Sequence, residues 1–132
     1  METTNTLLRQ ITILVVEDDM LLCWLTAEHL TAAGFLVIQA HSADDAVQIL
    51  KESDCAVEVV FSDVEMPGKL NGIGLANWVR RERPRVVTIL TSGQATMPED
   101  VLTHGPLMQK PYHVSDVEKL IRKMAAQECS SR

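Results

Sequence analysis

The sequence is poor in aromatic residues. Its 132 residues include only two tryptophans, one tyrosine and two phenylalanines, whereas hydrophobic residues of all kinds make up 46% of the chain. A core built from this sequence must therefore be aliphatic, with Leu, Val, Ile and Ala as its main components. The length suits one compact domain and is too short for a second full domain.

Cysteine, positive charge and long apolar runs are also scarce. Cys23, Cys55 and Cys129 have no paired spacing, which argues against a disulfide framework or a zinc site and favours a reducing, cytoplasmic compartment. The net charge of −6 argues against a general nucleic-acid-binding surface. No apolar run approaches the roughly 20 residues of a membrane helix, and residues 1–10 lack the apolar core of a signal peptide. We therefore expect neither nucleic acid nor membrane as a direct partner.

Short apolar runs that suit buried strands alternate with helical patterns along the chain. The five predicted strands are residues 11–16, 35–40, 57–62, 86–90 and 107–109. This alternation predicts an α/β fold, a doubly wound five-stranded parallel sheet of order 2-1-3-4-5 with helices on both faces. Between the last two strands the sequence holds only a short helical pattern near residues 98–103, so we expect a fourth helix that is shortened or missing.

The ends of the helices are marked by capping residues. Asp19 is better placed to start the first helix than to bind a metal, and Gly34 is its expected C-cap. Ser42 with Asp45, and Ser115 with Glu118, have the spacing of capping boxes. We place the folded domain at residues 10–126, after a flexible segment at 1–9 and before a C-terminal tail at 127–132.

Acidic residues stand at the ends of the first and third predicted strands. Glu17 and Asp18 follow the first strand, Asp63 follows the third, and the predicted strand order brings the two ends together. Three adjacent carboxylates repel one another and need a cation, and an open site of oxygen ligands points to Mg²⁺. Because Asp63 stands alone opposite the pair, it is the best candidate for a nucleophile that forms an acyl phosphate.

The fourth and fifth strands end in side chains that suit a phosphoryl group. Thr91 and Lys110 lie at the same predicted edge of the sheet as the carboxylates. The Lys110 ammonium would neutralise phosphoryl oxygens, and the Thr91 hydroxyl and nearby backbone N–H groups would hydrogen-bond to them.

Four segments together resemble the signature segments of the response-regulator receiver domains of bacterial two-component systems, of the kind seen in chemotaxis regulators. They occur in the expected order and read ILVVEDD, VVFSDVEMPG, VVTILTSG and LMQKPY. The resemblance covers about Ile11 to Ala126 and implies a flavodoxin-like fold. It also implies that Asp63 is the phosphoacceptor, that Thr91 moves toward the phosphoryl group, and that Lys110 binds it after an often cis Lys110–Pro111 bond.

The same resemblance implies the magnesium ligands. Asp18 and Asp63 match direct ligands, and the backbone carbonyl of Glu65 matches the third protein ligand. Glu17 matches an acid that usually reaches the metal through water. One position departs from the family, because Leu107 stands where Tyr or Phe is common and would swing inward, so activation must propagate differently here.

The implied function is a phosphorylation-dependent signalling switch. It would accept a phosphoryl group on Asp63 from a histidine kinase or a histidine phosphotransfer protein, and it would catalyse its own Mg²⁺-dependent phosphorylation and dephosphorylation without being a classical enzyme. Three alternatives remain: a receiver excised from a hybrid histidine kinase, a small-molecule aspartyl phosphatase, and a binding module that is never phosphorylated. The phosphatase is disfavoured because such enzymes usually have a second Asp where this chain has Glu65. Homodimerisation and the downstream protein target stay open.

The first predicted helix has apolar residues on more than one side. If Leu22, Leu25 and Leu30 face the sheet, then Leu21 and Trp24 point outward. Exposed large apolar residues can mark a partner surface, and kinases or phosphotransfer domains dock on this helix in the family the sequence resembles. The competing interpretation is that Trp24 folds over the edge of the core.

Overall fold

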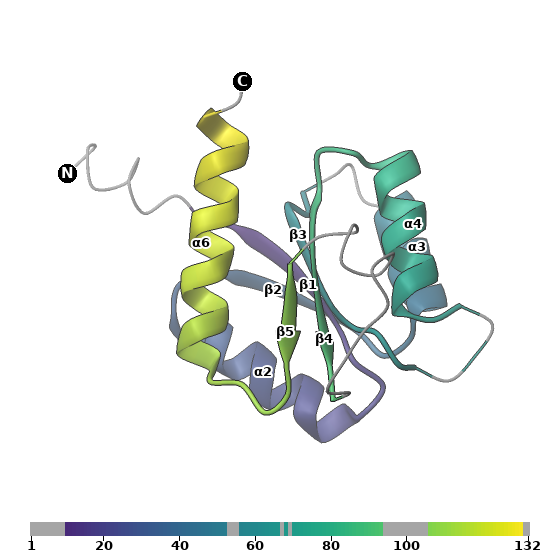
Figure 1. The fold of residues 1–132 in the computed structure, drawn as a ribbon, viewed down its shortest axis with the longest axis horizontal. Helices are drawn as coiled ribbons and strands as arrows, with labels where there is room; N and C mark the ends of the chain where they lie inside the picture. The colour runs from purple at the N-terminus through teal and green to yellow at the C-terminus, as the bar shows by residue number, and fades with distance from the viewer. Residues whose placement is uncertain (1–9, 53–55, 67, 69, 94–105, 131–132) are drawn as a thin grey trace.

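The computed structural model describes residues 10–52, 56–66, 68, 70–93 and 106–130 (Figure 1). Its strands are β1 (Thr12–Val16), β2 (Leu36–Ala40), β3 (Val59–Asp63), β4 (Val87–Ser92) and β5 (Leu107–Gln109). Its helices are α2 (Met20–Ala32), α3 (Ala43–Glu52), α4 (Gly72–Glu82) and α6 (Val114–Ser130). The shortened or missing fourth helix was expected within residues 94–105, which lie outside the described part of the chain.

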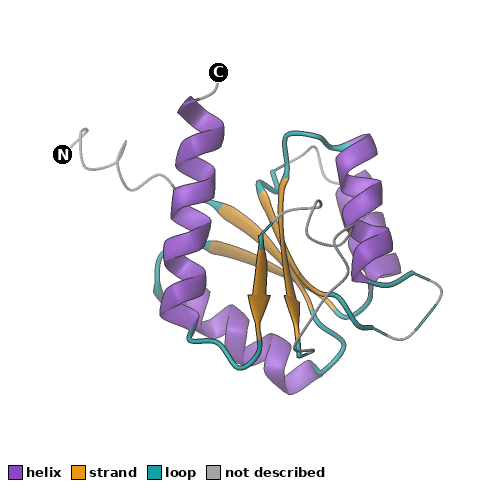
Figure 2. Cartoon of the chain, in the orientation of Figure 1, coloured by secondary structure: helices purple, strands orange, loops and turns teal. Residues whose placement is uncertain are grey.

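All five strands are parallel and form one sheet in the order β2-β1-β3-β4-β5. The predicted topology is therefore confirmed. Helices cover both faces, with α2 and α6 on one side and α3 and α4 on the other (Figures 1 and 2). This arrangement aligns the carboxyl ends of all the strands at one edge of the sheet.

Strand β1, which lies between β2 and β3, shows how the sheet separates two aliphatic cores. Ile13 and Val15 belong to a cluster with residues of α2 and α6, whereas Leu14 and Val16 belong to a cluster with residues of α3 and α4. Alternate side chains of a strand point to opposite faces, so a strand buried on both faces must be apolar throughout. Leu107 belongs to neither cluster and packs with a third, smaller one that includes Leu90.

Two of the predicted helix caps are confirmed, and Gly34 lies one residue past the C-cap of α2, which is Ala33. The Asp19 carboxylate accepts a hydrogen bond from the backbone N–H of Leu22 at 3.0 Å, so Asp19 begins α2. Gly34 follows α2 with a φ of +104°, a backbone conformation that glycine adopts at no steric cost. The Ser42 hydroxyl accepts from the N–H of Asp45 at 3.0 Å at the start of α3.

The predictions for α6 were wrong at both ends. The helix begins at Val114, and the N–H of Asp116 donates to the carbonyl of His113, so Ser115 lies inside the first turn and does not cap it. Glu118 pairs instead with Arg122 one turn later, at 3.4 Å. The helix also continues to Ser130, past the boundary placed at residue 126, because no Gly or Pro interrupts it.

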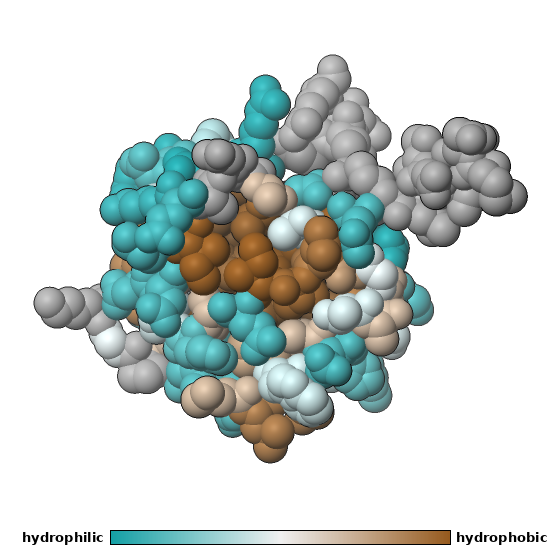
Figure 3. Space-filling view, turned by 180° about the vertical axis from the view of Figure 1, so that it is seen from behind, coloured by the Kyte–Doolittle hydropathy of each residue, from teal (hydrophilic) through white to brown (hydrophobic). Residues whose placement is uncertain are grey.

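Helix α2 exposes more apolar surface than predicted. Leu21 and Trp24 are exposed as expected, at 66% and 51%, but Leu25, which was expected to face the sheet, is 43% exposed. Apolar residues therefore form part of the surface as well as the core. Hydrophobic side chains also gather in one patch on the face seen from behind (Figure 3). Among the described residues, no helix has the length and apolar character to cross a membrane.

Candidate functional site

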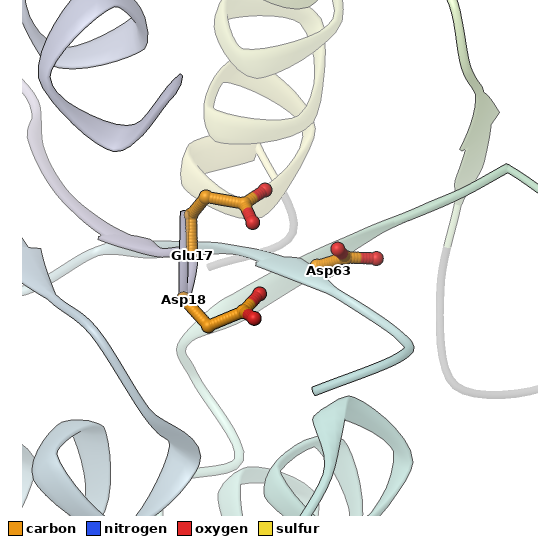
Figure 4. Close-up of side chains that lie close together, drawn as sticks. All are labelled: Glu17, Asp18 and Asp63. Atoms are coloured by element: carbon orange, nitrogen blue, oxygen red, sulfur yellow. The ribbon is translucent and has the colours of Figure 1, made fainter. Parts of the chain in front are cut away.

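The ends of β1 and β3 place three carboxylates together. Asp63 is the last residue of β3, and Glu17 and Asp18 directly follow β1, which pairs with β3. One oxygen from each of Glu17, Asp18 and Asp63 lies within 4.8 Å of the others (Figure 4). Glu17 and Asp63 are buried, whereas Asp18 is exposed, so the cluster is open to solvent on one side. The strand order therefore brings together the carboxylates that the sequence predicted.

Lys110 faces this cluster from the end of β5. Its backbone N–H donates to the carbonyl of Ser92 at 2.7 Å, which continues the pairing of β5 with β4 past Gln109. Its Nζ donates to Asp63 Oδ2 at 3.0 Å and lies 3.6 Å from Glu17 Oε1. The peptide bond from Lys110 to Pro111 is cis, as the resemblance implied.

The surroundings of the cluster raise the pKa values of both Glu17 and Lys110. Burial, together with the nearby Asp63, raises the pKa of Glu17, although a hydrogen bond from the N–H of Asp19 and the charge of Lys110 partly oppose the rise. Burial alone would lower the pKa of Lys110, but the hydrogen bond to Asp63 and the attraction of the two carboxylates raise it. Lys110 is therefore a full positive charge at neutral pH.

Thr91 lies beside Asp63 in the sheet. The two residues are partners in the register of β3 and β4, and the N–H of Val64 donates to the carbonyl of Thr91 at 2.8 Å. Thr91 is 2% exposed. The structure thus places the predicted hydroxyl residue next to the candidate nucleophile, held there by backbone pairing.

Glu65 stands two residues beyond Asp63 and is exposed. Its N–H donates to Asp63 Oδ1 at 3.3 Å, and its carboxylate accepts from the Ser92 hydroxyl at 3.4 Å. The loop that carries Glu65, whose carbonyl is the predicted third metal ligand, is therefore tied both to the end of β4 and to Asp63.

The donor set fits a hard divalent cation. Three carboxylates that are partly buried and close together carry more negative charge than Lys110 alone balances, and Mg²⁺ prefers oxygen ligands in sites where it can keep several waters. The exposed side of the cluster, at Asp18, leaves room for those waters. The carboxylate cluster can therefore hold Mg²⁺.

Residues 13–122 match the family described as Response regulator receiver domain. The chain belongs to this family. It is 31% identical over 124 residues to the uncharacterized transcriptional regulatory protein YrkP of Bacillus subtilis, a match that covers 88% of this chain and 52% of YrkP. It is 28% identical over 119 residues to the sensor kinase CckA of Brucella abortus, covering 86% of this chain and 12% of CckA. The receiver domain thus spans about half or less of these two relatives.

Solved structures agree with the fold. A CheY-like receiver domain protein from Methanospirillum hungatei superposes with a TM-score of 0.84 at 21% identity, covering 93% of this chain and 99% of the other. A receiver domain from Clostridium thermocellum gives the same TM-score at 22% identity, covering 92% and 99%. At this identity the likeness supports the receiver fold alone.

Sequence reasoning did not anticipate a pocket beside the receiver domain's carboxylate cluster. The pocket has a volume of about 620 Å³ and lies between α2 and the segment that follows β5. Its walls include Leu22, Leu25 and Thr26 of α2 and Lys110 and Tyr112 of that segment. His29 of α2 is exposed and lines the same pocket. Lys110 therefore belongs both to the charged cluster and to an apolar hollow.

Proposed function

We propose that this receiver domain is a phosphorylation switch that accepts a phosphoryl group on Asp63 from the phosphohistidine of a histidine kinase or phosphotransfer protein. The observation that carries the proposal is the placement of a strand-end carboxylate at 3.0 Å from a partly buried lysine and beside two further carboxylates, in a chain of this family. The cytoplasm, where such donors would be met, is the proposed location.

The phosphoryl transfer uses groups that already surround Asp63. A carboxylate oxygen of Asp63 attacks phosphorus, the bond from phosphorus to the donor histidine nitrogen breaks, and its electron pair stays on the imidazole. The ammonium of Lys110, which lies 3.0 Å from Asp63 Oδ2, would then contact and neutralise the phosphoryl oxygens. The hydroxyl of Thr91 and the N–H of Glu65 supply hydrogen bonds on the other side.

The proposed magnesium ligands are the carboxylates of Asp18 and Asp63, the backbone carbonyl of Glu65 and, through a water molecule, Glu17. When bound, Mg²⁺ supplies the positive charge that lets several carboxylates and phosphoryl oxygens share one site. The exposed position of Asp18 favours direct contact with a hydrated ion, whereas the ion pair of Glu17 with Lys110 keeps Glu17 in an outer position.

The donor protein is proposed to dock on α2. Met20, Leu21, Trp24 and Leu25 are large, apolar and 43–68% exposed, and the helix begins two residues after Asp18. A partner that covers this apolar surface would bring its phosphohistidine to the carboxyl edge of the sheet. Burial of such anchors typically provides most of the binding free energy of an interface.

The decisive test compares Asp63→Asn with Asp116→Asn, which replaces an exposed aspartate in the first turn of α6. With acetyl phosphate and Mg²⁺, intact-protein mass spectrometry should show one phosphoryl group on the wild-type chain and on Asp116→Asn. Asp63→Asn should remain unmodified, since its amide is a poor nucleophile. Modification of Asp63→Asn to the wild-type level, or steady turnover of a small phosphate ester, would contradict the proposal.

One alternative is favoured by a specific match. The similarity to the sensor kinase CckA fits a receiver that forms part of a longer kinase. The chemistry at Asp63 would be the same, but the donor would then belong to the same polypeptide. Immunodetection of the native protein distinguishes the two, because a kinase would migrate far above the position of a 132-residue chain.

A further inference from the structure

Two aromatic side chains touch each other beside the pair formed by Asp63 and Lys110. Phe61 precedes Asp63 by two residues in β3, and Tyr112 follows Lys110 by two residues. The ring centroids are 5.7 Å apart and the ring planes meet at 83°, an edge-to-face contact. Strand β3 and the segment after β5 are therefore joined twice, by the ion pair between Asp63 and Lys110 and by the aromatic contact between Phe61 and Tyr112.

Tyr112 is also fixed from the opposite side. Its hydroxyl interacts with the side chain of Thr26, a residue of α2 that is 4% exposed and lines the pocket beside the carboxylate cluster. The ring packs against the same buried cluster that contains Phe61 and the inner residues of α2 and α6. Tyr112 thus contacts both a central strand and a helix through one side chain.

Lys110 lies at the end of a short strand. Strand β5 is only three residues long, and Lys110 lies just past its end, where its N–H bonds to Ser92. On the other side, Pro111 and His113 are exposed, so Tyr112 is the first partly buried residue after the lysine. A lysine side chain has a large rotamer entropy, and its reach to a target depends on where its backbone is anchored.

We propose that Tyr112 is a positioning residue for Lys110. Its ring on Phe61 and its hydroxyl on Thr26 hold the segment after β5 so that Nζ faces Asp63, where the phosphoryl oxygens of the modified protein will lie. This inference rests on the proposed function and adds to it a residue outside the carboxylate cluster.

The test separates phosphoryl-oxygen binding from metal binding. Beryllofluoride mimics the phosphoryl group on Asp63, so its affinity should depend on Lys110, whereas Mg²⁺ affinity alone should not. Tyr112→Leu should weaken beryllofluoride binding by about ten- to a hundredfold, as expected for a displaced electrostatic contact, with Mg²⁺ affinity unchanged. Tyr112→Phe keeps the ring contact, so it should lose only about two- to threefold, and Thr26→Val should match it.

A matched control is Val114→Ala, which truncates another wall residue of the same pocket and leaves Tyr112, Phe61 and Thr26 in place. It should bind beryllofluoride like the wild type. Equal losses of Mg²⁺ and beryllofluoride affinity in Tyr112→Leu would mean general loosening and would overturn the positioning role, as would wild-type binding by that variant. Failure of the wild-type protein itself to bind beryllofluoride would instead overturn the proposed function on which this inference rests.

Discussion

Helices α2 and α3 both lie against the edge of the sheet formed by β1 and β2, yet they present opposite surfaces to solvent. Each has a buried face of small and aliphatic residues, represented by Leu30 in α2 and Leu50 in α3. The outer face of α3 is polar and consists of Asp44, Asp45, Gln48 and Lys51. The first half of the outer face of α2 is apolar and consists of Met20, Leu21, Trp24 and Leu25, whereas Glu28, His29 and Thr31 are exposed farther along the helix.

The requirements of folding explain the outer surface of α3 but not that of α2. An amphipathic helix with a polar outer face, such as α3, satisfies the needs of a sheet-covering helix. In α2, apolar residues also occupy part of the outer face, where they are exposed and do not contribute to the packed core. That surface begins directly beside Asp18 and the carboxylate cluster, so it lies where the proposed phosphoryl donor would approach.

The largest expected effects test whether the two buried faces are equivalent. Leu30 and Leu50 are 0% and 2% exposed, and truncation of either to alanine should lower the free energy of unfolding by about 2–5 kcal/mol. Urea denaturation followed by circular dichroism measures both. A loss below about 1 kcal/mol for Leu30→Ala alone would mean that α2 is loosely held and that its apolar outer face reflects poor packing.

A smaller effect tests the outer faces. The kinase for this test is the one that phosphorylates the wild-type chain fastest when several histidine kinases are compared. Trp24→Ala should slow phosphotransfer from that kinase by about tenfold, as expected for loss of about 1.4 kcal/mol of docking free energy. Its rate with acetyl phosphate, which needs no docking, should not change. The free energy of unfolding should change by less than about 0.5 kcal/mol because Trp24 is 51% exposed.

The matched variant on α3 is Gln48→Ala, which removes an exposed side chain from the corresponding outer face. Phosphotransfer to it should proceed at the wild-type rate. If Trp24→Ala transfers as fast as Gln48→Ala, the docking role of α2 is wrong. The remaining explanation would be that Trp24 only covers the edge of the core.

The comparison also shows what the sequence could and could not predict. The strand ends at Glu17, Asp63 and Lys110 follow from short apolar runs, because a run buried on both faces stops where charged residues begin. The predicted meeting of Glu17, Asp18 and Asp63 then follows from strand order. These features depend on local pattern and on the few topologies open to parallel sheets.

The errors arise where competing contacts, either local or long-range, override the expected pattern. Ser115 and Glu118 have a capping-box spacing, yet His113 provides the carbonyl that begins α6, and Glu118 pairs with Arg122. Leu25 has the period of a core residue but lies over the pocket beside Tyr112. The contact between Tyr112 and Phe61 joins segments far apart in the chain, and no local pattern announces it.

The smallest effect concerns the buried face of α2 and its dependence on pH. Cys23 is 0% exposed, and burial, with a contribution from Glu17, raises the pKa of its thiol from 9.0 to about 11. The unfolded chain therefore releases this proton at lower pH than the folded chain, so stability falls as pH rises through the interval between the two values. Between about pH 8.5 and pH 10 the wild type should lose about 1 kcal/mol more than Cys23→Ala, measured by urea denaturation under reducing conditions. Helix α3 buries Ala43 and Ala46 where α2 buries a thiol, so its inner face adds no pH dependence of this kind. Identical pH profiles for the wild type and Cys23→Ala would show that the inner face of α2 is open to water.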